Sequence, residues 1–395
     1  MVFKNIKFSG LEGNITKMFF FLFTQRRHII PLFSLFFFML PDANAKLLGI
    51  FTAFAYLVSF FLEIPSGYFA DYFGHKNTLI LSKIVMIFSM TTFYFGDTIY
   101  WYFLASTLLS ISFAFQSGSI SALMHNTLED LRRESEFGKI MGRIRGNVSL
   151  VAVLTLTLLP FLTSIDFKLP FLINLIIDFF GLAIVLSFVN PSQHFIKKKK
   201  EEKKSINELI VLANKFNFYS VSIFSGATAG FFFAEVSFRY LYLDLLGFPL
   251  VYVGIVAGGS RVVWFLVARY AYLIKKYLTM KQHFLIEVFL MPLIFISMAF
   301  FSNPYFVGII SAMGIGYMFG RSDIVTQYIL DDYLPDKNYK ATFLSINGQV
   351  SSMIKFVATI SVGFIMDYSF KLGYYVLGTL LFITLIGSYY FIRKH

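Results

Sequence analysis

Long apolar runs alternate with short polar turns along the whole chain. Each run holds about 20 residues or more, which is the length that an α-helix needs to cross the apolar layer of a bilayer. The pattern predicts twelve membrane-spanning helices, at approximately 16–40, 46–70, 77–96, 99–124, 140–163, 168–190, 217–243, 249–274, 282–301, 304–329, 341–367 and 371–392. The expected fold class is therefore an all-α membrane protein.

The polar turns carry different charges on the two sides of the predicted bundle. The turns PDANAK and GDTIY, like the others on their side, are short and nearly uncharged. Basic residues lie in the alternate turns and at both ends of the chain: Lys4, Lys7, Lys76, Arg132, Arg133, Lys197 to Lys200, Lys275, Lys276, Lys337, Lys340, Arg393 and Lys394. Because basic loops are retained in the cytoplasm, both termini are expected there.

The longest polar run, IKKKKEEKKSINEL, divides the chain near its midpoint. Six predicted spans lie on either side of it, which is a common plan for transporters built from two related halves. We therefore expect an N-terminal six-helix bundle at 1–190, a cytoplasmic basic linker at 191–216 and a C-terminal six-helix bundle at 217–395. A solvated linker is a better interpretation of this charge run than a ligand site.

Composition limits the classes of function that the chain can have. Only 14% of the residues are charged, against about 25% in soluble domains. The net charge of +12 is explained by cytoplasmic loops, so no nucleic-acid partner is expected. The chain has no cysteine, which excludes disulfides and thiol catalysis. Without a Walker loop, a metal-ligand spacing or a clustered catalytic set, we expect neither an enzyme, nor a cofactor, nor a metal site.

One loop carries a motif. Between the second and third spans the chain reads EIPSGYFADYFGHKNT, in which Gly67, Asp71, Gly74 and Lys76 fit the pattern G-x-x-x-D-x-x-G-x-[RK]. Gly67 is expected to allow a close approach of helices, and Gly74 a tight turn. Asp71 is expected to end the helix, and Lys76 to lie at the cytoplasmic surface.

This motif resembles the signature loop of the major facilitator superfamily. EIPSG, FQSGSISAL and LPDKNYKATFLSI also resemble one bacterial branch of that family. The resemblance implies twelve transmembrane helices in two pseudo-symmetric six-helix bundles around a central cavity. It implies a monomeric secondary transporter of the bacterial inner (cytoplasmic) membrane. It also implies that Asp71, supported by Lys76, bonds across to the other half and closes the cytoplasmic side.

Two stretches depart from the family pattern. His125 and Asn126 stand where this branch often has an acidic pair, and the fifth span lacks the G-P-x-x-G-G element of proton-coupled drug antiporters. The second departure weakens the interpretation as a multidrug exporter.

Ionisable residues within the spans indicate the substrate, because a charge at bilayer depth is costly and usually functional. In the resembling family, spans one, four, seven and ten line the cavity, and spans two, five, eight and eleven flank it. Six basic residues are then expected near the cavity, together with the acids Glu235 and Asp323 and with Glu63 as a third acid. This excess of positive charge favours an anionic substrate. The predicted substrate-binding residues are Gln25, Arg26, Arg27, Gln116, Glu235, Arg239, Arg261, Arg321 and Lys355.

Several alternatives stay open at this point. Successive helix residues are about 100° apart, so only one of Arg26 and Arg27 can face the cavity squarely. Glu235 and Arg239 are four residues apart, so a neutral bridge between helices explains them as well as a binding role does. Asp178 in the sixth span has no apparent partner.

Protonatable groups near these basic residues suggest coupling to protons. The candidates are Glu63, Glu235, Asp323 and His28. The function that we expect is a proton-coupled secondary active transporter that works by alternating access. Its substrate would be a small organic anion such as a carboxylate-rich metabolite or a siderophore. The alternative is a proton antiporter for multidrug or metabolite efflux.

Overall fold

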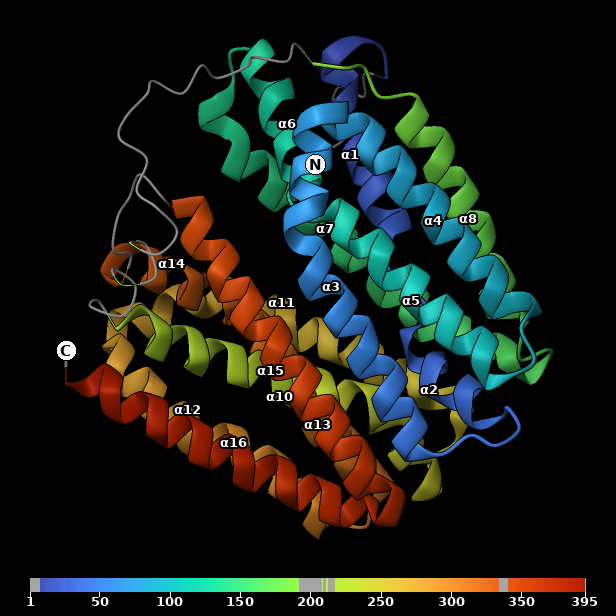
Figure 1. Cartoon of the computed structure of the whole chain (residues 1–395), viewed down its shortest axis with the longest axis vertical. Coiled ribbons are helices and arrows are strands. Elements are labelled where there is room, and N and C mark those ends of the chain that lie inside the picture. The colour runs from blue at the N-terminus through green and yellow to red at the C-terminus, as the bar shows by residue number, and fades with distance from the viewer. Residues whose placement is uncertain (1–7, 192–207, 209–210, 212–216, 334–339, 395) are drawn as a thin grey trace. The chain divides into compact units, whose positions relative to one another are not determined.

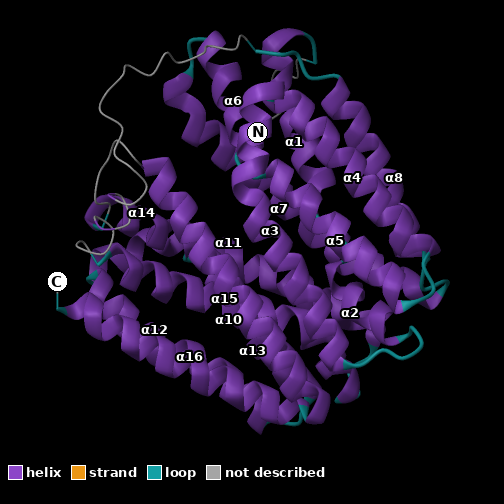
Figure 2. Cartoon of the chain, in the orientation of Figure 1, coloured by secondary structure: helices purple, strands orange, loops and turns teal. Residues whose placement is uncertain are grey.

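The computed structural model describes residues 8–191, 208, 211, 217–333 and 340–394, and every regular element in these ranges is helical (Figure 2). The helices are α1 (Gly10–Gln25), α2 (Ile30–Phe38), α3 (Ala45–Phe73), α4 (His75–Phe95), α5 (Ile99–Gln116), α6 (Ser119–Asp130), η1 (Glu134–Glu136), α7 (Phe137–Leu158), η2 (Leu159–Ser164), α8 (Leu169–Leu186), α10 (Phe218–Leu245), η3 (Leu250–Tyr252), α11 (Val253–Tyr277), α12 (Met280–Phe300), α13 (Pro304–Gly320), α14 (Ser322–Asp332), α15 (Lys340–Tyr368) and α16 (Phe370–Arg393).

Each predicted span contains one helix or two consecutive helices. Among the described residues, ten helical segments are long and apolar enough to cross a bilayer. The two other predicted spans, 16–40 and 304–329, are each divided into two shorter helices. A helix satisfies its own backbone hydrogen bonds, which is why apolar runs in lipid adopt this structure. The all-helical membrane fold is confirmed, and the expected count of twelve spans is consistent with this arrangement.

The chain divides into two compact units. Unit 1 comprises residues 1–42, 58–197 and 251–258, and unit 2 comprises residues 43–57, 198–250 and 259–395. Two long helices are therefore shared, since the first part of α3 belongs to unit 2 and the first part of α11 to unit 1. The predicted linker lies almost wholly outside the described residues, so the predicted domain boundaries stay predictions.

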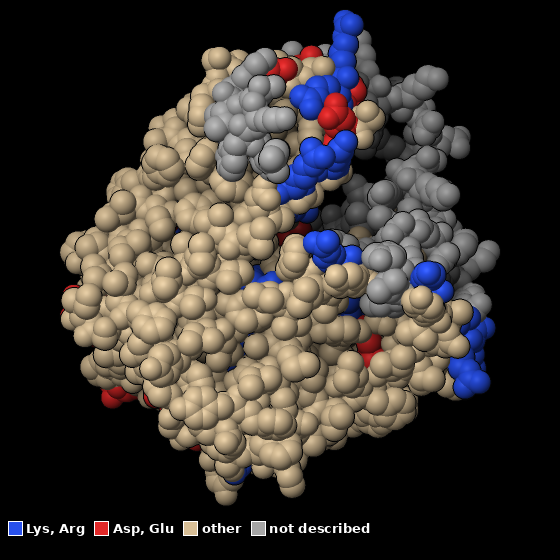
Figure 3. Space-filling model, turned by 180° about the vertical axis from the view of Figure 1, so that it is seen from behind, with Lys and Arg blue, Asp and Glu red and all other residues tan. Residues whose placement is uncertain are grey.

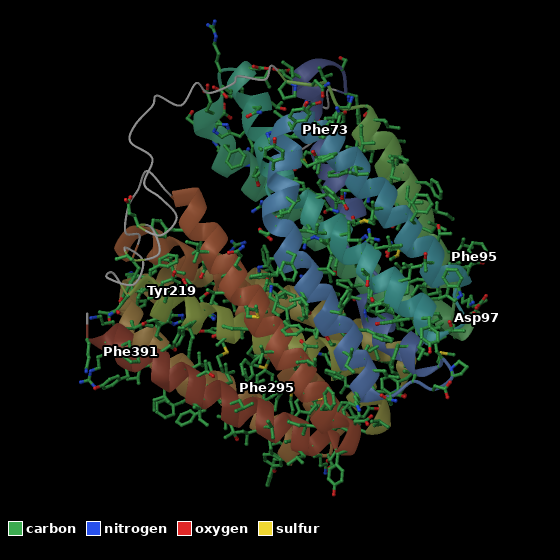
Figure 4. All side chains as sticks on the ribbon, viewed as in Figure 1. Phe73, Phe95, Asp97, Tyr219, Phe295 and Phe391 are labelled. Atoms are coloured by element: carbon green, nitrogen blue, oxygen red, sulfur yellow. The ribbon has the colours of Figure 1, made fainter. Side chains whose placement is uncertain are left out.

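Unit 1 is built around α1 and α4. α4 packs against α5, α6 and α8, while α1 packs against α6, α7 and α8 (Figure 1). Between α1, α6 and α7 lies an apolar core that includes Met18, Met124 and Ile144. Phe73 lies near one end of α4, and Phe95 and Asp97 lie near the other (Figure 4). The turns before and after α4 are thus at opposite ends of the helix, as a membrane span requires.

Unit 2 is built around α10. This helix packs against α13, α15 and α16, and α12 packs against α13 and α16. The first part of α3 contacts α15 backbone to backbone, because a Cβ added to Gly49 would lie 2.7 Å from the Cα of Gly363. Such small-residue contacts are typical of helix pairs in membranes. Tyr219 and Phe391 lie at one end of the unit (Figure 4), where the Asn217 side chain donates to the Phe391 carbonyl at 3.3 Å.

The outer surface fits a lipid environment. On the face in Figure 3, Lys, Arg, Asp and Glu occupy only a few places. Large apolar side chains are exposed on several helices, for example Phe88 on α4, Phe179 on α8 and Phe289 on α12. Exposed apolar area on this scale marks a surface that is covered by lipid or protein.

Candidate functional site

A four-residue break interrupts the first predicted span. α1 ends at Gln25 and α2 begins at Ile30, so the expectation of one continuous helix over 16–40 is wrong here. Pro31 lies in the first turn of α2, where its missing N–H costs nothing and its fixed φ favours the start of a new helix. Arg26 has an extended backbone, so the 100° spacing of helix residues does not apply to Arg26 and Arg27.

The second arginine of the break belongs to a buried ion cluster. Arg27 Nη1 and Nη2 donate to Asp178 Oδ2 and Oδ1 at 2.7 and 2.8 Å. Lys83 Nζ on α4 donates to the same Oδ1 at 2.9 Å, and Asn174 donates to Oδ2 at 3.3 Å. Arg27 is 4% exposed, while Lys83 and Asp178 are fully buried. Asp178 thus has two basic partners, and the sequence interpretation missed Lys83.

The same cations satisfy the end of α1. Thr24 O accepts from Arg27 Nη2 at 2.7 Å and from Lys83 Nζ at 2.9 Å, and Gln25 Oε1 lies 3.3 Å from Lys83 Nζ. His28 bridges Phe23 O, at 3.2 Å from Nε2, and the hydroxyl of Thr155, at 2.7 Å from Nδ1. The last carbonyls of a helix have no partner within it and carry partial negative charge, so cations stabilise them.

The other predicted substrate-binding and proton-coupling residues of unit 1 are Arg26, Glu63 and Gln116. Arg26 is half-buried. Glu63 is also half-buried, and its Oε1 accepts from Ser117 Oγ at 3.2 Å. Gln116 is buried, and its amide donates to Ser82 and Ser112, at 2.9 and 3.3 Å.

A second break divides the fourth predicted span. α5 ends at Gln116, and Gly118 precedes α6 with a positive φ of 77°. Glycine adopts this backbone conformation readily because it has no Cβ.

In unit 2, Glu235 and Arg239 form a buried pair on α10. Arg239 Nε donates to Glu235 Oε1 at 2.7 Å, and Arg239 Nη2 pairs with Oε2. Ser311 Oγ on α13 donates to the same Oε1 at 2.8 Å. Each member of the ion pair is 1% exposed. The pair therefore also joins α10 to α13.

Arg321 lies at the junction of α13 and α14 and pairs with a buried acid of α12. Its Nε lies 3.1 Å from Glu287 Oε1, and Tyr317 OH donates to this oxygen at 3.1 Å. His283, one turn before Glu287, places its Nε2 3.1 Å from the same oxygen. Asp323, a predicted proton-coupling residue, lies in α14, and its side chain is outside the described residues.

A cluster of aromatic rings and cations lies in unit 2. We call it the aromatic–cation cluster: Phe233, Trp264 and Phe319 with Arg261 and Lys355. Arg261 lies over the Trp264 and Phe319 rings at 5.0 and 5.6 Å, and Lys355 Nζ lies 4.4 Å from the Phe233 ring. Phe319 stacks on Trp264 at 5.2 Å and meets Phe233 edge-on at 5.6 Å. All five residues are half-buried.

This cluster joins two kinds of recognition chemistry. Ring faces stack against planar groups and attract cations, while guanidinium and ammonium groups bind carboxylate or phosphate. Its members come from α10, α11, α13 and α15, and Tyr56 of α3 adds a ring 6.5 Å from Phe233. The sequence interpretation named Arg261 and Lys355 but none of the rings.

The signature loop forms the turn between α3 and α4. Gly74 precedes α4 with φ 90° and ψ 146°, and Lys76 Nζ donates to the Phe188 carbonyl at 2.7 Å. α3 ends at Phe73, two residues beyond Asp71, whose side chain is outside the described residues. A Cβ added to Gly67 would meet no described atom within 4 Å, so the structure does not show the close helix approach expected there.

Replacement of Gly74 by alanine is expected to destabilise the protein by about 1–3 kcal/mol, because this backbone region is nearly restricted to glycine. The measurement is the thermal midpoint of the purified protein in detergent. Gly67→Ala is the matched control, because Gly67 is helical and its added methyl group has open space. Equal midpoints for the two variants would contradict the strain at Gly74.

Sequence comparison connects the chain to a transporter family. A family model described as Major Facilitator Superfamily matches residues 18–359. An uncharacterized transporter of Buchnera aphidicola subsp. Schizaphis graminum is 25% identical over 224 residues, which are 55% of this chain. The match spans 56% of the length of that relative.

Solved structures with the same fold include a mutant of the nucleoside transporter NupG. It aligns with a TM-score of 0.78 at 12% identity, over 98% of this chain and 99% of that one. A bacterial homologue of the human lysosomal transporter Spinster aligns with a TM-score of 0.69 at 13% identity, over 96% and 95% of the two chains. At such low identity these likenesses concern the fold.

Proposed function

The chain belongs to the Major Facilitator Superfamily, and from this premise we propose that it transports a small organic anion with a planar part, coupled to protons. As a member of this family, the protein is a multi-pass membrane transporter of a small molecule and not an enzyme. We further propose alternating access, a monomer, and a bacterial inner membrane with both termini in the cytoplasm.

The anionic charge of the substrate is supported by the residues that keep accessible surface. Arg27, Arg239 and Arg321 are buried in pairs with acids, which makes them poor candidates for direct contact. The predicted binding cations that are half-buried are Arg26 in unit 1, and Arg261 and Lys355 in unit 2. Among the predicted acids with described side chains, Glu63 is half-buried. Among the predicted residues whose side chains are described and half-buried, three cations therefore stand against one acid.

The planar part of the substrate is supported by the aromatic–cation cluster, which is the observation that carries this proposal. Three rings lie within 6 Å of a neighbouring ring, and two cations lie over their faces. A solute with an unsaturated ring and a carboxylate or phosphate matches both features. A carboxylate-rich metabolite or a siderophore with such a ring fits. The related fold of a nucleoside transporter is compatible with a planar solute.

Replacement of Arg261 or Lys355 by glutamine is expected to raise the KM for the transported anion at least tenfold, because each change removes a charge-assisted contact. The measurement is uptake into proteoliposomes from a panel of radiolabelled aromatic carboxylates, aliphatic carboxylates, nucleotides and nucleosides. Arg269→Gln is the matched control, because Arg269 lies exposed on the same helix against Phe265 and Tyr270.

Two outcomes would contradict the proposal. One is an unchanged KM in both cluster variants when Arg269→Gln is also unchanged. The other is transport of neutral or cationic drugs in preference to every anion, which would support the alternative of a multidrug efflux antiporter. Substrate-dependent acidification of the vesicle interior, read with a trapped pH dye, tests proton coupling in the same preparation.

A further inference from the structure

The buried lysine of unit 1 has the surroundings of a bound cation. Lys83 Nζ lies 2.9 Å from Thr24 O, 2.9 Å from Asp178 Oδ1 and 3.3 Å from Gln25 Oε1. These groups are a main-chain carbonyl, a carboxylate and an amide, the oxygen ligands that hard cations prefer. Met86 Sδ at 3.6 Å and the Phe21 ring at 5.8 Å complete the surroundings.

The place of this nitrogen in the fold explains why a cation is needed. α1 ends inside the predicted membrane span, and its last carbonyls carry the negative end of the helix dipole. In transporters with interrupted helices, unwound carbonyls and half-helix C-termini coordinate free cations. We propose that the C-terminal end of α1 forms a monovalent-cation site and that the Lys83 ammonium occupies it as a tethered ion.

The charges of the cluster agree with this assignment. Arg27 and Asp178 neutralise each other through two hydrogen bonds. The remaining positive charge is that of Lys83, which meets the carbonyl of Thr24 and the amide oxygen of Gln25. A bound monovalent ion would leave the net charge of the site unchanged, and therefore can replace the ammonium electrostatically.

The packing around the lysine is also specific. A Cβ added to Gly181 on α8 would lie 2.5 Å from Lys83 Cε and 2.9 Å from Nζ. The glycine thus makes room for the lysine stem where α8 passes α4. Because Lys83 is fully buried, its truncation leaves a space that is enclosed by the same oxygen atoms.

Truncation therefore converts the tethered ion into an exchangeable one. Lys83→Ala removes the ammonium and leaves room, so Na⁺ or methylammonium is expected to bind between Thr24 O, Gln25 Oε1 and Asp178 Oδ1. Lys83→Met removes the charge but fills the space, so it is expected to bind neither ion. In the wild-type protein the ammonium blocks the site.

The experiment compares thermal midpoints of the purified full-length protein in NaCl, methylammonium chloride and choline chloride at equal ionic strength. Ligand that binds only the folded state raises the midpoint. For Lys83→Ala we expect a rise of about 2 °C or more in Na⁺ or methylammonium relative to choline. The wild-type protein and Lys83→Met are expected to show no such difference.

Lys17→Ala on α1 is a matched control. Lys17 Nζ also donates to a carbonyl at a helix end, that of Ser187, and Lys17 is 9% exposed. Since no described carboxylate accepts a hydrogen bond from Lys17, truncation is expected to create no cation site. The proposal is overturned if Lys83→Ala responds equally to all three salts, or if Lys83→Met or Lys17→Ala responds as Lys83→Ala does.

The test also works if Lys83→Ala is too unstable to purify in choline. Extraction and size-exclusion chromatography are then carried out in parallel in methylammonium chloride and choline chloride. Recovery of folded monomer in methylammonium alone supports the cation site. Equal loss in both salts overturns it.

Discussion

Asp178→Asn is expected to destabilise the protein by about 3–5 kcal/mol, the cost of breaking a buried ion pair by removing one partner. The change leaves Arg27 and Lys83 as two uncompensated cations that are almost completely buried. It also removes the acceptor that orients both of them toward the end of α1. We expect a large loss of folded, monodisperse protein after detergent extraction and a lower thermal midpoint of the remainder.

Asp97→Asn is the matched control, because Asp97 is exposed in the turn between α4 and α5. It should leave yield and midpoint unchanged. The double variant Asp178→Asn/Lys83→Met retains one cation, Arg27, and is expected to regain part of the lost stability. A thermal midpoint of Asp178→Asn within 2 °C of the wild-type value would show that the buried ion cluster contributes little to stability.

The order and extent of the helices could be predicted from the sequence, but the interruptions could not. Hydropathy averages over a window of about 20 residues, so a break of four residues with apolar flanks does not lower the signal. The structural causes of the breaks are local, such as Pro31 in the first turn of α2 and the positive φ of Gly118. Each interruption therefore depends on one or two residues that the average conceals.

Partners within one helix turn could be recognised from the sequence, whereas partners on different helices could not. Glu235 and Arg239 were expected to be able to pair because they are four residues apart, and they do pair. Asp178 meets Arg27 from a position 151 residues away and Lys83 from one 95 residues away. Helix packing brings these distant residues into contact, and the apolar pattern does not specify which helices are neighbours.

The rings of the aromatic–cation cluster were missed for a different reason. The chain contains 52 phenylalanines, so Phe233 and Phe319 do not stand out in the sequence. Trp264 offered the better signal, since it is one of only two tryptophans and lies three residues after Arg261 on a predicted span. That spacing places both side chains on one face of a helix, where the structure shows them in contact.

Breaking the buried Glu235–Arg239 pair of unit 2 is the second change that is expected to lower stability strongly. Glu235→Gln leaves Arg239 as a buried cation without a full countercharge, and a loss of about 3–5 kcal/mol is expected. Arg239→Met leaves the opposite charge uncompensated, apart from the Ser311 hydroxyl, and should cost a similar amount. Glu136→Gln is the control, since Glu136 pairs with Arg133 while their side chains stay 41% and 36% exposed, and it should not shift the thermal midpoint.

The double variant Glu235→Gln/Arg239→Met separates a structural bridge from a role in proton coupling. Because it leaves no unpaired charge, it should be more stable than either single variant. If Glu235, one of the four residues predicted for proton coupling, carries the coupled proton, the double variant should exchange substrate across vesicles at equal concentrations but fail to acidify their interior. Normal acidification would remove Glu235 from the coupling mechanism and leave the pair as a bridge between α10 and α13. A double variant no more stable than the single ones would contradict the ion-pair argument itself.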